Sequence, residues 1–243
     1  MSIYINPGVT INPGVQISVP INIPVSNGLV VNLDAGNSAS YPGYGTDWTD
    51  LVSSSVYTLI NNPTYSSSFG GYFDFNPSSI QYAQGPSLPS TLLNWSIDVW
   101  HYYNGTNSGG SPCIVTEKFT SNINFTLGNT NDSSTNLQAG FFNGQWNTTP
   151  LGYTLTPGYW YNIAGTYDGS IIKLYINGVV VESQVSSSTP VSSGTGIYLM
   201  KRWDNYENDC WGGKLSVVNI YNRALNNAEI LQNFNYYRTR YGI

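Results

Sequence analysis

The chain opens with a long run in which apolar and polar positions alternate. Between residues 3 and 25 every odd position is apolar or proline, while the even positions are mostly polar or small. A six-residue unit repeats within it, at 5–10 and again at 11–16, and each copy contains Pro-Gly. Alternation with period two is typical of a strand with one apolar face, and Pro-Gly favours a type II turn. The pattern predicts an extended arm, residues 1–27, that bends at each repeat.

An apolar face of this length needs a surface to lie on, because the arm cannot bury it alone. A flexible tail is the alternative, although tails rarely keep strict alternation. We expect a docking arm that lies on copies of the same chain, with a trimer favoured, or on another protein. Residues 1–25 contain no charged side chain, so this docking should be insensitive to salt. The docking positions are Ile3, Ile5, Val9, Ile11, Val15, Ile17, Val19, Ile21 and Ile23.

The remainder, residues 28–243, predicts one all-β domain. Strand-like runs at 29–33, 94–103, 160–167, 171–176, 179–182 and 214–221 are separated by Gly, Pro, Asn and Ser clusters. The Asn177-Gly178 pair between two of them is a strong hairpin signal. In the run at 94–103, Trp95, Ile97 and Val99 share one face and Trp100 lies on the other. In the run at 214–221, Leu215 and Val217 are expected to share a face.

Only the C-terminal segment predicts a helix. Asn226 followed three residues later by Glu229 forms the pattern of a capping box. Apolar residues then recur at helical spacing and predict a face that packs on the sandwich. These residues are Ile230, Leu231, Phe234 and Tyr237. The fold class is therefore an antiparallel sandwich with an extended N-terminal β arm and a short C-terminal helix.

Composition narrows the function classes. Only 9% of the 243 residues are charged and the net charge is −5, which argues against nucleic acid as a partner. No apolar run approaches the ~20 residues that span a bilayer, so we expect no membrane insertion. The N-terminus lacks the pattern of a signal peptide, so secretion by that route is not expected. Cys113 and Cys210 then fit two reduced thiols better than a bridge.

Two segments carry a resemblance to a known fold family. The first is the run Trp160-Tyr-Asn-Ile-Ala-Gly-Thr-Tyr-Asp-Gly169, followed by Leu174-Tyr-Ile-Asn-Gly178. The second is Gly213-Lys-Leu-Ser-Val-Val-Asn-Ile-Tyr-Asn-Arg-Ala-Leu225, which continues to Ala228-Glu-Ile230. Both are similar to the laminin-G/pentraxin-like branch of the concanavalin A-like lectins and glucanases. Residues 95–100 resemble the central strand of that family. The resemblance covers about residues 29–235 and implies a jelly roll of two large antiparallel sheets.

A second, shorter resemblance concerns the arm and the two ends of the domain. The Ile-Asn-Pro-Gly-Val units, the opening Leu33-Asp-Ala-Gly-Asn37 and the ending at 238–243 resemble structural proteins of tailed bacteriophages. It implies a virion protein that is assembled in the host cytoplasm and displayed on the virion surface, with capsid or tail proteins as partners. Our leading prediction is a non-enzymatic capsid decoration protein anchored by the arm, ahead of a tail adhesin that binds host glycans.

Residues for catalysis are sparse. The family resemblance implies that a glucanase would carry a Glu-x-Asp-x-x-Glu strand, whereas the nearest cluster here, Asp204, Glu207 and Asp209, has the opposite order. A glycoside hydrolase is therefore the third hypothesis, and we expect no enzyme activity. The single histidine, His101, fits a core or edge position better than a triad. We expect no cofactor, although Asp34 at a strand end leaves Ca²⁺ as an alternative.

Sugar binding remains open because the chain is rich in aromatic and amide side chains. Aromatic rings stack on the C–H faces of sugars, while amides and hydroxyls bond their hydroxyl groups. Large aromatic residues in a sandwich also fill the core or subunit contacts, and the sequence does not separate these roles. The candidates for a glycan site are Trp100, Tyr102, Trp146 and Trp203.

Overall fold

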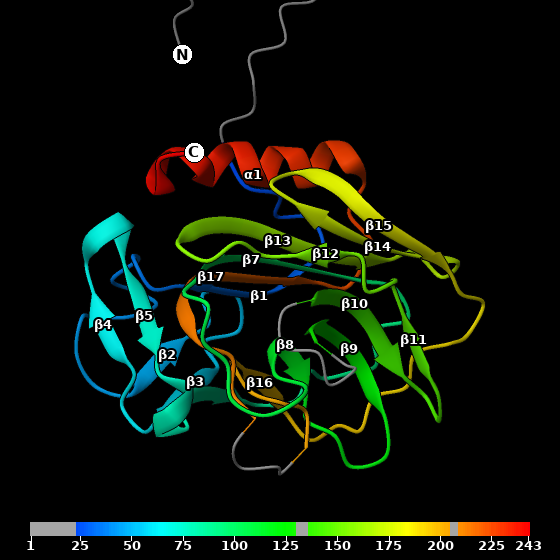
Figure 1. Ribbon diagram of the computed structural model, residues 1–243, viewed down its shortest axis with the longest axis horizontal. Coiled ribbons are helices and arrows are strands. Elements are labelled where there is room, and N and C mark those ends of the chain that lie inside the picture. The colour runs from blue at the N-terminus through cyan, green and yellow to red at the C-terminus, as the bar shows by residue number, and fades with distance from the viewer. Residues whose placement is uncertain (1–22, 130–135, 205–208) are drawn as a thin grey trace, which may run out of the picture.

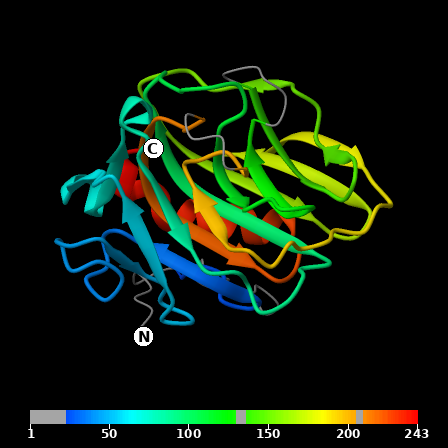
Figure 2. The same ribbon diagram turned by 90° about the horizontal axis from the view of Figure 1, so that it is seen from below.

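Two antiparallel β-sheets stack face to face, and one helix, α1 (Asn227–Tyr241), covers the outer face of one of them (Figure 1). The computed structural model describes residues 23–129, 136–204 and 209–243. We call the sheet next to the helix sheet A and the other sheet B. Seen from below, the strands of sheet B lie in front and α1 lies behind (Figure 2). The predicted all-β sandwich with one C-terminal helix is confirmed.

Sheet A has eight strands, and the long strand β7 lies near its centre. Its order is β15 (Val179–Val185), β14 (Ile171–Ile176), β13 (Tyr159–Tyr167), β7 (Trp95–Tyr103), β17 (Gly213–Tyr221), β5 (Tyr72–Phe75) and β4 (Thr64–Ser66), with β1 (Leu29–Asp34) also paired to β17. The six predicted strands all fall in this sheet.

Sheet B has nine strands, none of which the sequence pattern predicts. Its order is β11 (Trp146–Thr148), β10 (Asn136–Phe142), β9 (Ile123–Gly128), β8 (Cys113–Glu117), β16 (Ile197–Leu199), β6 (Tyr82–Gly85), β3 (Val56–Ile60) and β2 (Asp47–Thr49), with β12 (Tyr153–Thr154) also paired to β10. Two short 3₁₀ turns, η1 (Ser68–Gly70) and η2 (Pro77–Ser79), flank β5. The strands at the ends of the order are short.

The main core lies between the sheets and follows the predicted alternation of β7. Trp95, Ile97 and Val99 point into this core, whereas Trp100 packs with the helix on the other face. The Asn177-Gly178 turn between β14 and β15 has φ values of 51° and 82°, which is the left-handed geometry that an Asn-Gly hairpin provides at low cost. Both local predictions are confirmed.

The predicted alternation of β17 is wrong at one point. Leu215 was expected to share a face with Val217, but Leu215 packs in the core between the sheets together with Val218, whereas Val217 faces α1. The reason is a β-bulge between Leu215 and Val217, which interrupts the pairing with β7. An extra residue in a bulge shifts the side chains after it to the opposite faces.

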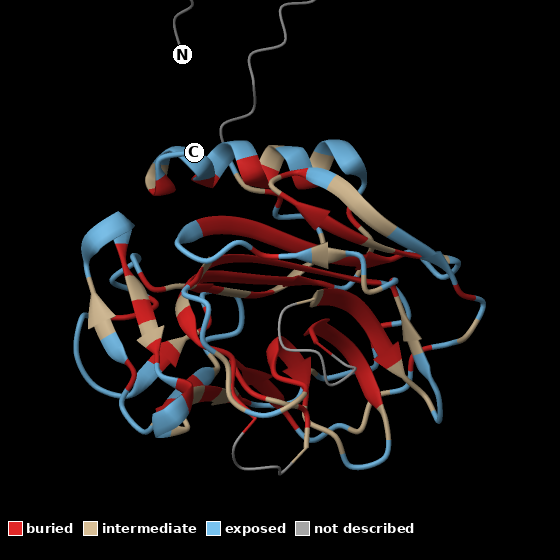
Figure 3. Ribbon diagram, in the orientation of Figure 1, coloured by how far each residue is buried: buried red, intermediate tan, exposed pale blue. Residues whose placement is uncertain are grey.

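Helix α1 begins with the predicted capping box. The Asn226 side chain accepts from the backbone of Ala228 and Glu229, and the Glu229 side chain accepts from the backbone of Asn226. The inner face of the helix is buried and the outer face is exposed (Figure 3). Ile230, Phe234 and Tyr237 are buried as expected, whereas Leu231 is 44% exposed and Asn233 is buried in its place.

A buried polar network explains why an asparagine occupies the inner face of α1. Asn233 Nδ2 donates to Asp98 Oδ2 on β7 (2.7 Å) and to Tyr221 Oη on β17 (3.0 Å). Asn162 Nδ2 on β13 donates to Asp98 Oδ1. Burial raises the pKa of Asp98 to about 6, although the two amide donors oppose that rise. The network ties the helix to three strands of sheet A.

The same network holds the base of the arm. The Val25 N–H donates to Asn233 Oδ1 (2.8 Å), and Tyr221 Oη donates to Val25 O (3.0 Å). Gln232 Nε2 on α1 donates to Ile23 O (3.0 Å). The docking positions from Ile3 to Ile21 lie outside the described residues, whereas Ile23 is described and 58% exposed. The chain therefore joins the sandwich at residues 23–25, on the side that α1 covers.

No helix in the described ranges has the length and apolar character that crossing a membrane requires.

Candidate functional site

The four aromatic candidates lie in three different environments, and Trp100 is the least accessible of them. It is fully buried between sheet A and α1. Its ring lies 4.2 Å from that of Tyr241 and 5.9 Å from that of Phe234, and both contacts are stacked. Because both helix residues cover this ring, Trp100 offers no surface to a sugar.

Tyr102 lies on the same face of sheet A, beside the C-terminal end of α1, and is half-buried. Its cross-strand neighbours are Trp160 on β13 and Lys214 on β17. The Lys214 ammonium lies 4.6 Å from the centre of the Tyr102 ring and 4.7 Å from that of Tyr72. Burial raises the pKa of nearby Asp74, while Lys214 opposes that rise. The cation therefore occupies the space beside Tyr102.

Trp146 and Trp203 come together although 57 positions separate their numbers in the chain. Their ring centroids are 4.9 Å apart at an interplanar angle of 67°. Phe142 also contacts Trp146, at 5.2 Å. Trp146 is 36% exposed, whereas Trp203 is only 7% exposed and packs toward Cys113 and Ile123. Trp203 thus supports Trp146, and Trp146 presents the accessible ring.

Two chain segments hold this pair in place. The tight turn between β10 and β11 sets Phe142 directly opposite Trp146 in the pairing. After β16 the chain turns over the outer side of sheet B, where the Phe119 N–H donates to Trp203 O (2.6 Å). The Arg202 guanidinium lies 4.9 Å from the centre of the Trp203 ring. The rings are therefore fixed by backbone pairing and not only by contact with one another.

A hollow of about 330 Å³ lies beside the exposed tryptophan. Ser186 Oγ donates to Asn147 Oδ1 (3.0 Å), and Gln138 Nε2 donates to Thr148 Oγ1 (3.0 Å), so part of the lining is held in a fixed orientation. Gln184 is exposed and its amide is directed to the neighbouring backbone. The lining consists of Trp146, Asn147, Thr148, Gln184, Val185, Ser186, Ser187 and Ser188.

This lining combines an accessible indole ring with amide and hydroxyl groups. Such a set can stack on an apolar sugar face and exchange hydrogen bonds with sugar hydroxyls. Sequence reasoning found Trp146 and Trp203 but missed Asn147, Thr148, Gln184 and the three serines. Short polar residues of these types occur in every loop of this chain, so composition gave no signal that would single them out.

Two larger hollows lack this combination. One, of about 520 Å³, lies beside the start of α1 and contains a single aromatic residue, Tyr175. Tyr175 is 1% exposed and its hydroxyl donates to Asn227 Oδ1 (3.0 Å), so its ring is not offered to a ligand. The other, of about 550 Å³, lies beside β3 and β6 and contains no aromatic side chain. Chemistry, and not volume, singles out the hollow at Trp146.

The acidic residues near Trp203 are engaged by a cation. Arg202 pairs with Asp204 (3.1 Å) and with Asp209 (2.7 Å), and Asp209 is 4% exposed. Glu207 lies outside the described residues. Asp34, the candidate for Ca²⁺, accepts instead from Arg240 through both carboxylate oxygens, at 2.8 and 3.0 Å. Within the described ranges, no group of three or more His, Cys, Asp or Glu could hold a metal ion.

His101 and the two cysteines belong to the interior. The His101 Nδ1–H donates to Lys214 O (3.0 Å), and its Nε2 accepts from the Trp211 indole (3.0 Å). Burial lowers the pKa of His101 to about 3, so the ring is neutral. Cys113 and Cys210 are both buried and unbridged, and burial raises the pKa of the Cys113 thiol to about 12. These thiols are poor nucleophiles.

The fold and the hollow together define a concanavalin A-like β-sandwich with an aromatic surface site. Residues 77–231 match the Laminin_G_3 family, described as the concanavalin A-like lectin/glucanases superfamily. Because this match spans more than half of the chain, the protein belongs to that family. The family prediction is confirmed, while the bacteriophage context stays a prediction. A comparison with curated proteins gives no match.

Solved structures with low sequence identity share the fold. Domain 4 of AbnA, a GH43 extracellular arabinanase from Geobacillus stearothermophilus solved with arabinotriose, aligns with a TM-score of 0.67 at 16% identity, covering 84% of this chain and 97% of that one. The binding domain of Paraclostridial Mosquitocidal Protein 1 aligns with a TM-score of 0.67 at 17% identity, covering 86% and 52%. Trypanosoma rangeli sialidase with the inhibitor DANA aligns with a TM-score of 0.62 at 15% identity.

These alignments differ in how much of each neighbour they span. The chain matches nearly the whole of the arabinanase domain, about half of the mosquitocidal binding domain and 33% of the sialidase. It therefore corresponds to one unit of the larger proteins.

Proposed function

We propose that this protein is a non-catalytic carbohydrate-binding domain whose site is the hollow at Trp146. The observation that carries the proposal is the pairing of Trp146 with Trp203 beside a lining of amides and hydroxyls. Two structural neighbours, one solved with arabinotriose and one named a binding domain, support this proposal.

Binding would begin with the indole of Trp146, because it is the exposed ring of the pair. An apolar sugar face covers that ring, and Trp203 keeps it from turning away. Thr148 and Gln184 then offer donors and acceptors to the sugar hydroxyls. Asn147 offers an acceptor through Oδ1, because its Nδ2 already donates to Asn143 Oδ1 and Gln145 O. Each such hydrogen bond contributes only about 1 kcal/mol net, so specificity would come from several contacts made together.

The absence of catalysis is part of the same proposal. Retaining glycosidases need two free carboxyl groups about 5 Å apart, whereas Asp204 and Asp209 are both paired with Arg202. A glycoside hydrolase is the alternative, and it would need Glu207 as a catalytic carboxylate. Turnover of a β-glucan that disappears in Glu207→Gln would establish the hydrolase and overturn the non-catalytic assignment.

The anchoring role of the arm is a second proposal, and the fixed base of the arm favours it. The chain joins the sandwich on the α1 side, through Val25 and Ile23, whereas the hollow lies at the edge of sheet B. An arm fastened to a capsid or tail protein would therefore leave the hollow accessible to host glycans. This role is tested by deleting residues 1–22 and measuring incorporation into virions, which we expect to be lost.

The glycan proposal is tested with the full chain on an array of neutral and charged oligosaccharides, followed by calorimetry on each hit. Trp146→Ala should weaken binding at least tenfold, because it removes the exposed ring. Tyr44→Ala is the matched control, since Tyr44 is 76% exposed in a loop outside the hollow. An array without any hit, or equal affinity of wild type and Trp146→Ala, would refute the proposal.

A further inference from the structure

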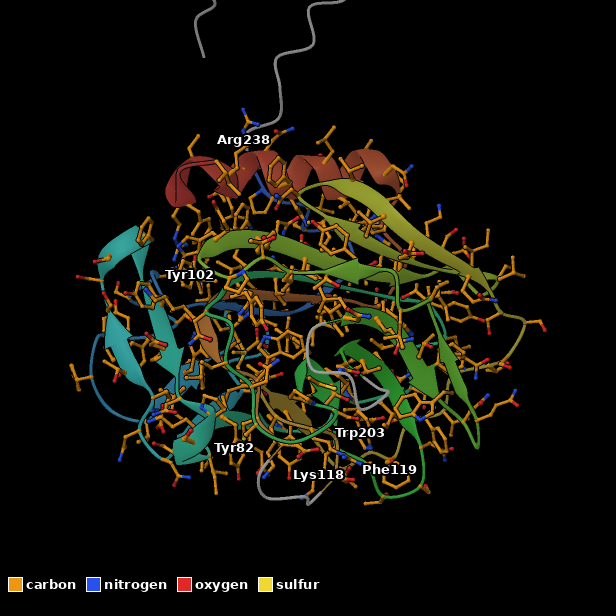
Figure 4. All side chains as sticks on the ribbon, viewed as in Figure 1. Tyr82, Tyr102, Lys118, Phe119, Trp203 and Arg238 are labelled. Atoms are coloured by element: carbon orange, nitrogen blue, oxygen red, sulfur yellow. The ribbon has the colours of Figure 1, made fainter. Side chains whose placement is uncertain are left out.

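The hollow at Trp146 has two walls, and they come from different sheets of the sandwich. The first wall is the β10–β11 hairpin of sheet B, which contributes residues 146–148 to the lining. The second wall is the segment 184–189, where β15 of sheet A ends and the following loop begins. Trp203, which contacts Trp146, lies on the side of the molecule away from Arg238 on α1 (Figure 4). The shape of the hollow therefore depends on what joins the two walls.

The second wall is fixed to sheet A by its own hydrogen bonds. The Ser186 N–H donates to Ser170 O (2.8 Å) in the turn between β13 and β14. The hydroxyl of buried Tyr167 on β13 is directed at Ser186 O (3.2 Å) and Ser188 O (2.6 Å). These bonds hold the second wall to one sheet, but they do not connect it to the hairpin of the other sheet.

A chain of three hydrogen bonds makes that connection, and two asparagine side chains form its middle. Asn143 Nδ2 donates to Thr189 O (2.9 Å) on the second wall. Asn143 Oδ1 accepts from Asn147 Nδ2 (3.0 Å), and Asn147 Oδ1 accepts from Ser186 Oγ (3.0 Å). The chain thus leaves the second wall at Thr189, crosses the hairpin and returns to the second wall at Ser186.

The orientation of both amides follows from their partners. Thr189 O and Gln145 O are carbonyl oxygens, which only accept, so the Asn143 nitrogen faces the first and the Asn147 nitrogen faces the second. This leaves Asn147 Oδ1 to face Ser186. A residue at position 143 that cannot donate would break the bond to Thr189.

We propose that Asn143 is the positioning residue of the carbohydrate site and holds the two walls in their binding arrangement. Asn143 is half-buried and does not line the hollow, so it acts through Asn147 and Thr189 and not by contact with a ligand. Walls that are already in place need less ordering when a saccharide binds. This inference rests on the proposed function and adds to it the residue that sets the geometry of the site.

Asn143→Asp tests this role, because the hydrogen bonds that an aspartate forms change with pH. At pH 7 its carboxylate can only accept, so it keeps the bond from Asn147 and repels Thr189 O. At pH 4 a protonated carboxyl group has one O–H donor, which takes the place of the amide N–H toward Thr189. An aspartate ordinarily titrates at about pH 3.9, and a hydrogen bond to the neutral form raises that value.

Binding is measured by calorimetry on the full chain at pH 7 and pH 4, each variant against wild type at the same pH. The probe is cellotriose, a neutral trisaccharide, or the tightest hit of the oligosaccharide array where cellotriose does not bind. We expect Asn143→Asp to bind about tenfold more weakly than wild type at pH 7 and within about threefold of it at pH 4. Asn143→Ala cannot form the bond and should stay about tenfold weaker at both pH values.

Asn104→Asp is the matched control. Asn104 is also an asparagine followed by glycine, it is exposed outside the hollow, and its Oδ1 accepts from the N–H and hydroxyl of Thr106. An aspartate keeps this acceptor, so the control should bind like wild type at both pH values. Thermal melts at each pH verify that every variant is folded.

The outcomes separate this inference from the proposed function. Wild-type affinity of Asn143→Asp at pH 7, with Trp146→Ala weakened, would overturn the positioning role and keep the carbohydrate site. A loss in Asn143→Asp that persists at pH 4 would also overturn it, because the restored donor would then have no effect. Failure of cellotriose and of every array sugar to bind the wild type would overturn both.

Discussion

Two faces of this molecule contain the same kinds of side chain and differ in what covers them. On the outer face of sheet A, Trp100 lies beside Asn233 and Asp98 under α1 and is fully buried. At the edge of sheet B, Trp146 lies beside Asn147 and Thr148 and is 36% exposed. Both places combine an indole with amide groups, and only the second is open to a ligand. Access, and not residue type, decides which of them is a binding site.

The outer face of sheet A is closed by α1, and the helix provides partners for the polar groups beneath it. Under α1 the amides of Asn162 and Asn233 both donate to one carboxylate, Asp98. A buried hydrogen-bond network holds its elements in one arrangement, and this one fixes the helix and the base of the arm. At the open face, Gln184 and Ser187 remain exposed and are available to a ligand.

The largest expected effect is on stability at the closed face. Trp100→Ala should lower the free energy of unfolding by about 3–5 kcal/mol, because it empties a core position between α1 and sheet A. Trp146→Ala should lower it by only about 1–2 kcal/mol, because the half-covered ring gives up its contacts with Trp203 and Phe142 without emptying a core position. Urea denaturation of both variants measures the difference. Equal destabilisation would mean that Trp146 is a core residue and not a site.

The second prediction concerns pH and the same closed face. The pKa of Asp98 rises from 3.8 to about 6 on folding, so the folded state binds this proton more tightly and the contribution of Asp98 to stability falls as pH rises from about 4 to 6. His101 has the opposite sign, because its pKa falls from 6.5 to about 3. The contribution of His101 to stability therefore falls as pH drops from about 6.5 to 3.

Asp98→Asn isolates the first of these effects. Relative to wild type, its stability should increase by roughly 2 kcal/mol as pH rises from about 4 to 6. Thermal melts at half-unit pH steps give this difference. A difference that stays constant over the window would show that Asp98 keeps an ordinary pKa.

The third prediction locates the end of the removable arm. Deletion of residues 1–22 should leave stability within about 0.5 kcal/mol. Deletion of residues 1–25 should cost about 2–3 kcal/mol, since it removes buried Val25 and its two hydrogen bonds to Asn233 and Tyr221. Denaturation of the two truncations compares them directly, and identical stabilities would place the base of the arm outside the folded unit.

The smallest expected effect is on glycan affinity at Tyr102. Its exposure is intermediate between that of buried Trp100 and that of accessible Trp146. Lys214 occupies the space beside this half-buried ring, so Tyr102→Ala should leave glycan affinity within about twofold of wild type while Trp146→Ala loses at least tenfold. Calorimetry with one array hit suffices. A comparable loss in both variants would extend the site to the face of sheet A that α1 covers.

The sequence predicted the sandwich because its longest strands alternate clearly, as β7 does with Trp95, Ile97 and Val99. It did not predict sheet B, because the strands of that sheet are short or lack a long, regular alternation of apolar and polar residues. It placed Trp100 correctly on the second face of β7, yet it gave no sign that α1, more than 120 residues later, would cover that face. The pairing of Trp146 with Trp203 depends on a loop crossing sheet B, and no local pattern records such a contact.

If the hollow is the binding site, a ligand contacts Trp146 and not the tryptophans under α1. The seven indole N–H groups of this chain can be followed individually by NMR during titration with a bound oligosaccharide. We expect the Trp146 resonance to shift most, Trp203 to shift with it, and Trp100 and Trp160 to keep their positions. Shifts at Trp100 or Trp160 with an unchanged Trp146 would contradict this expectation.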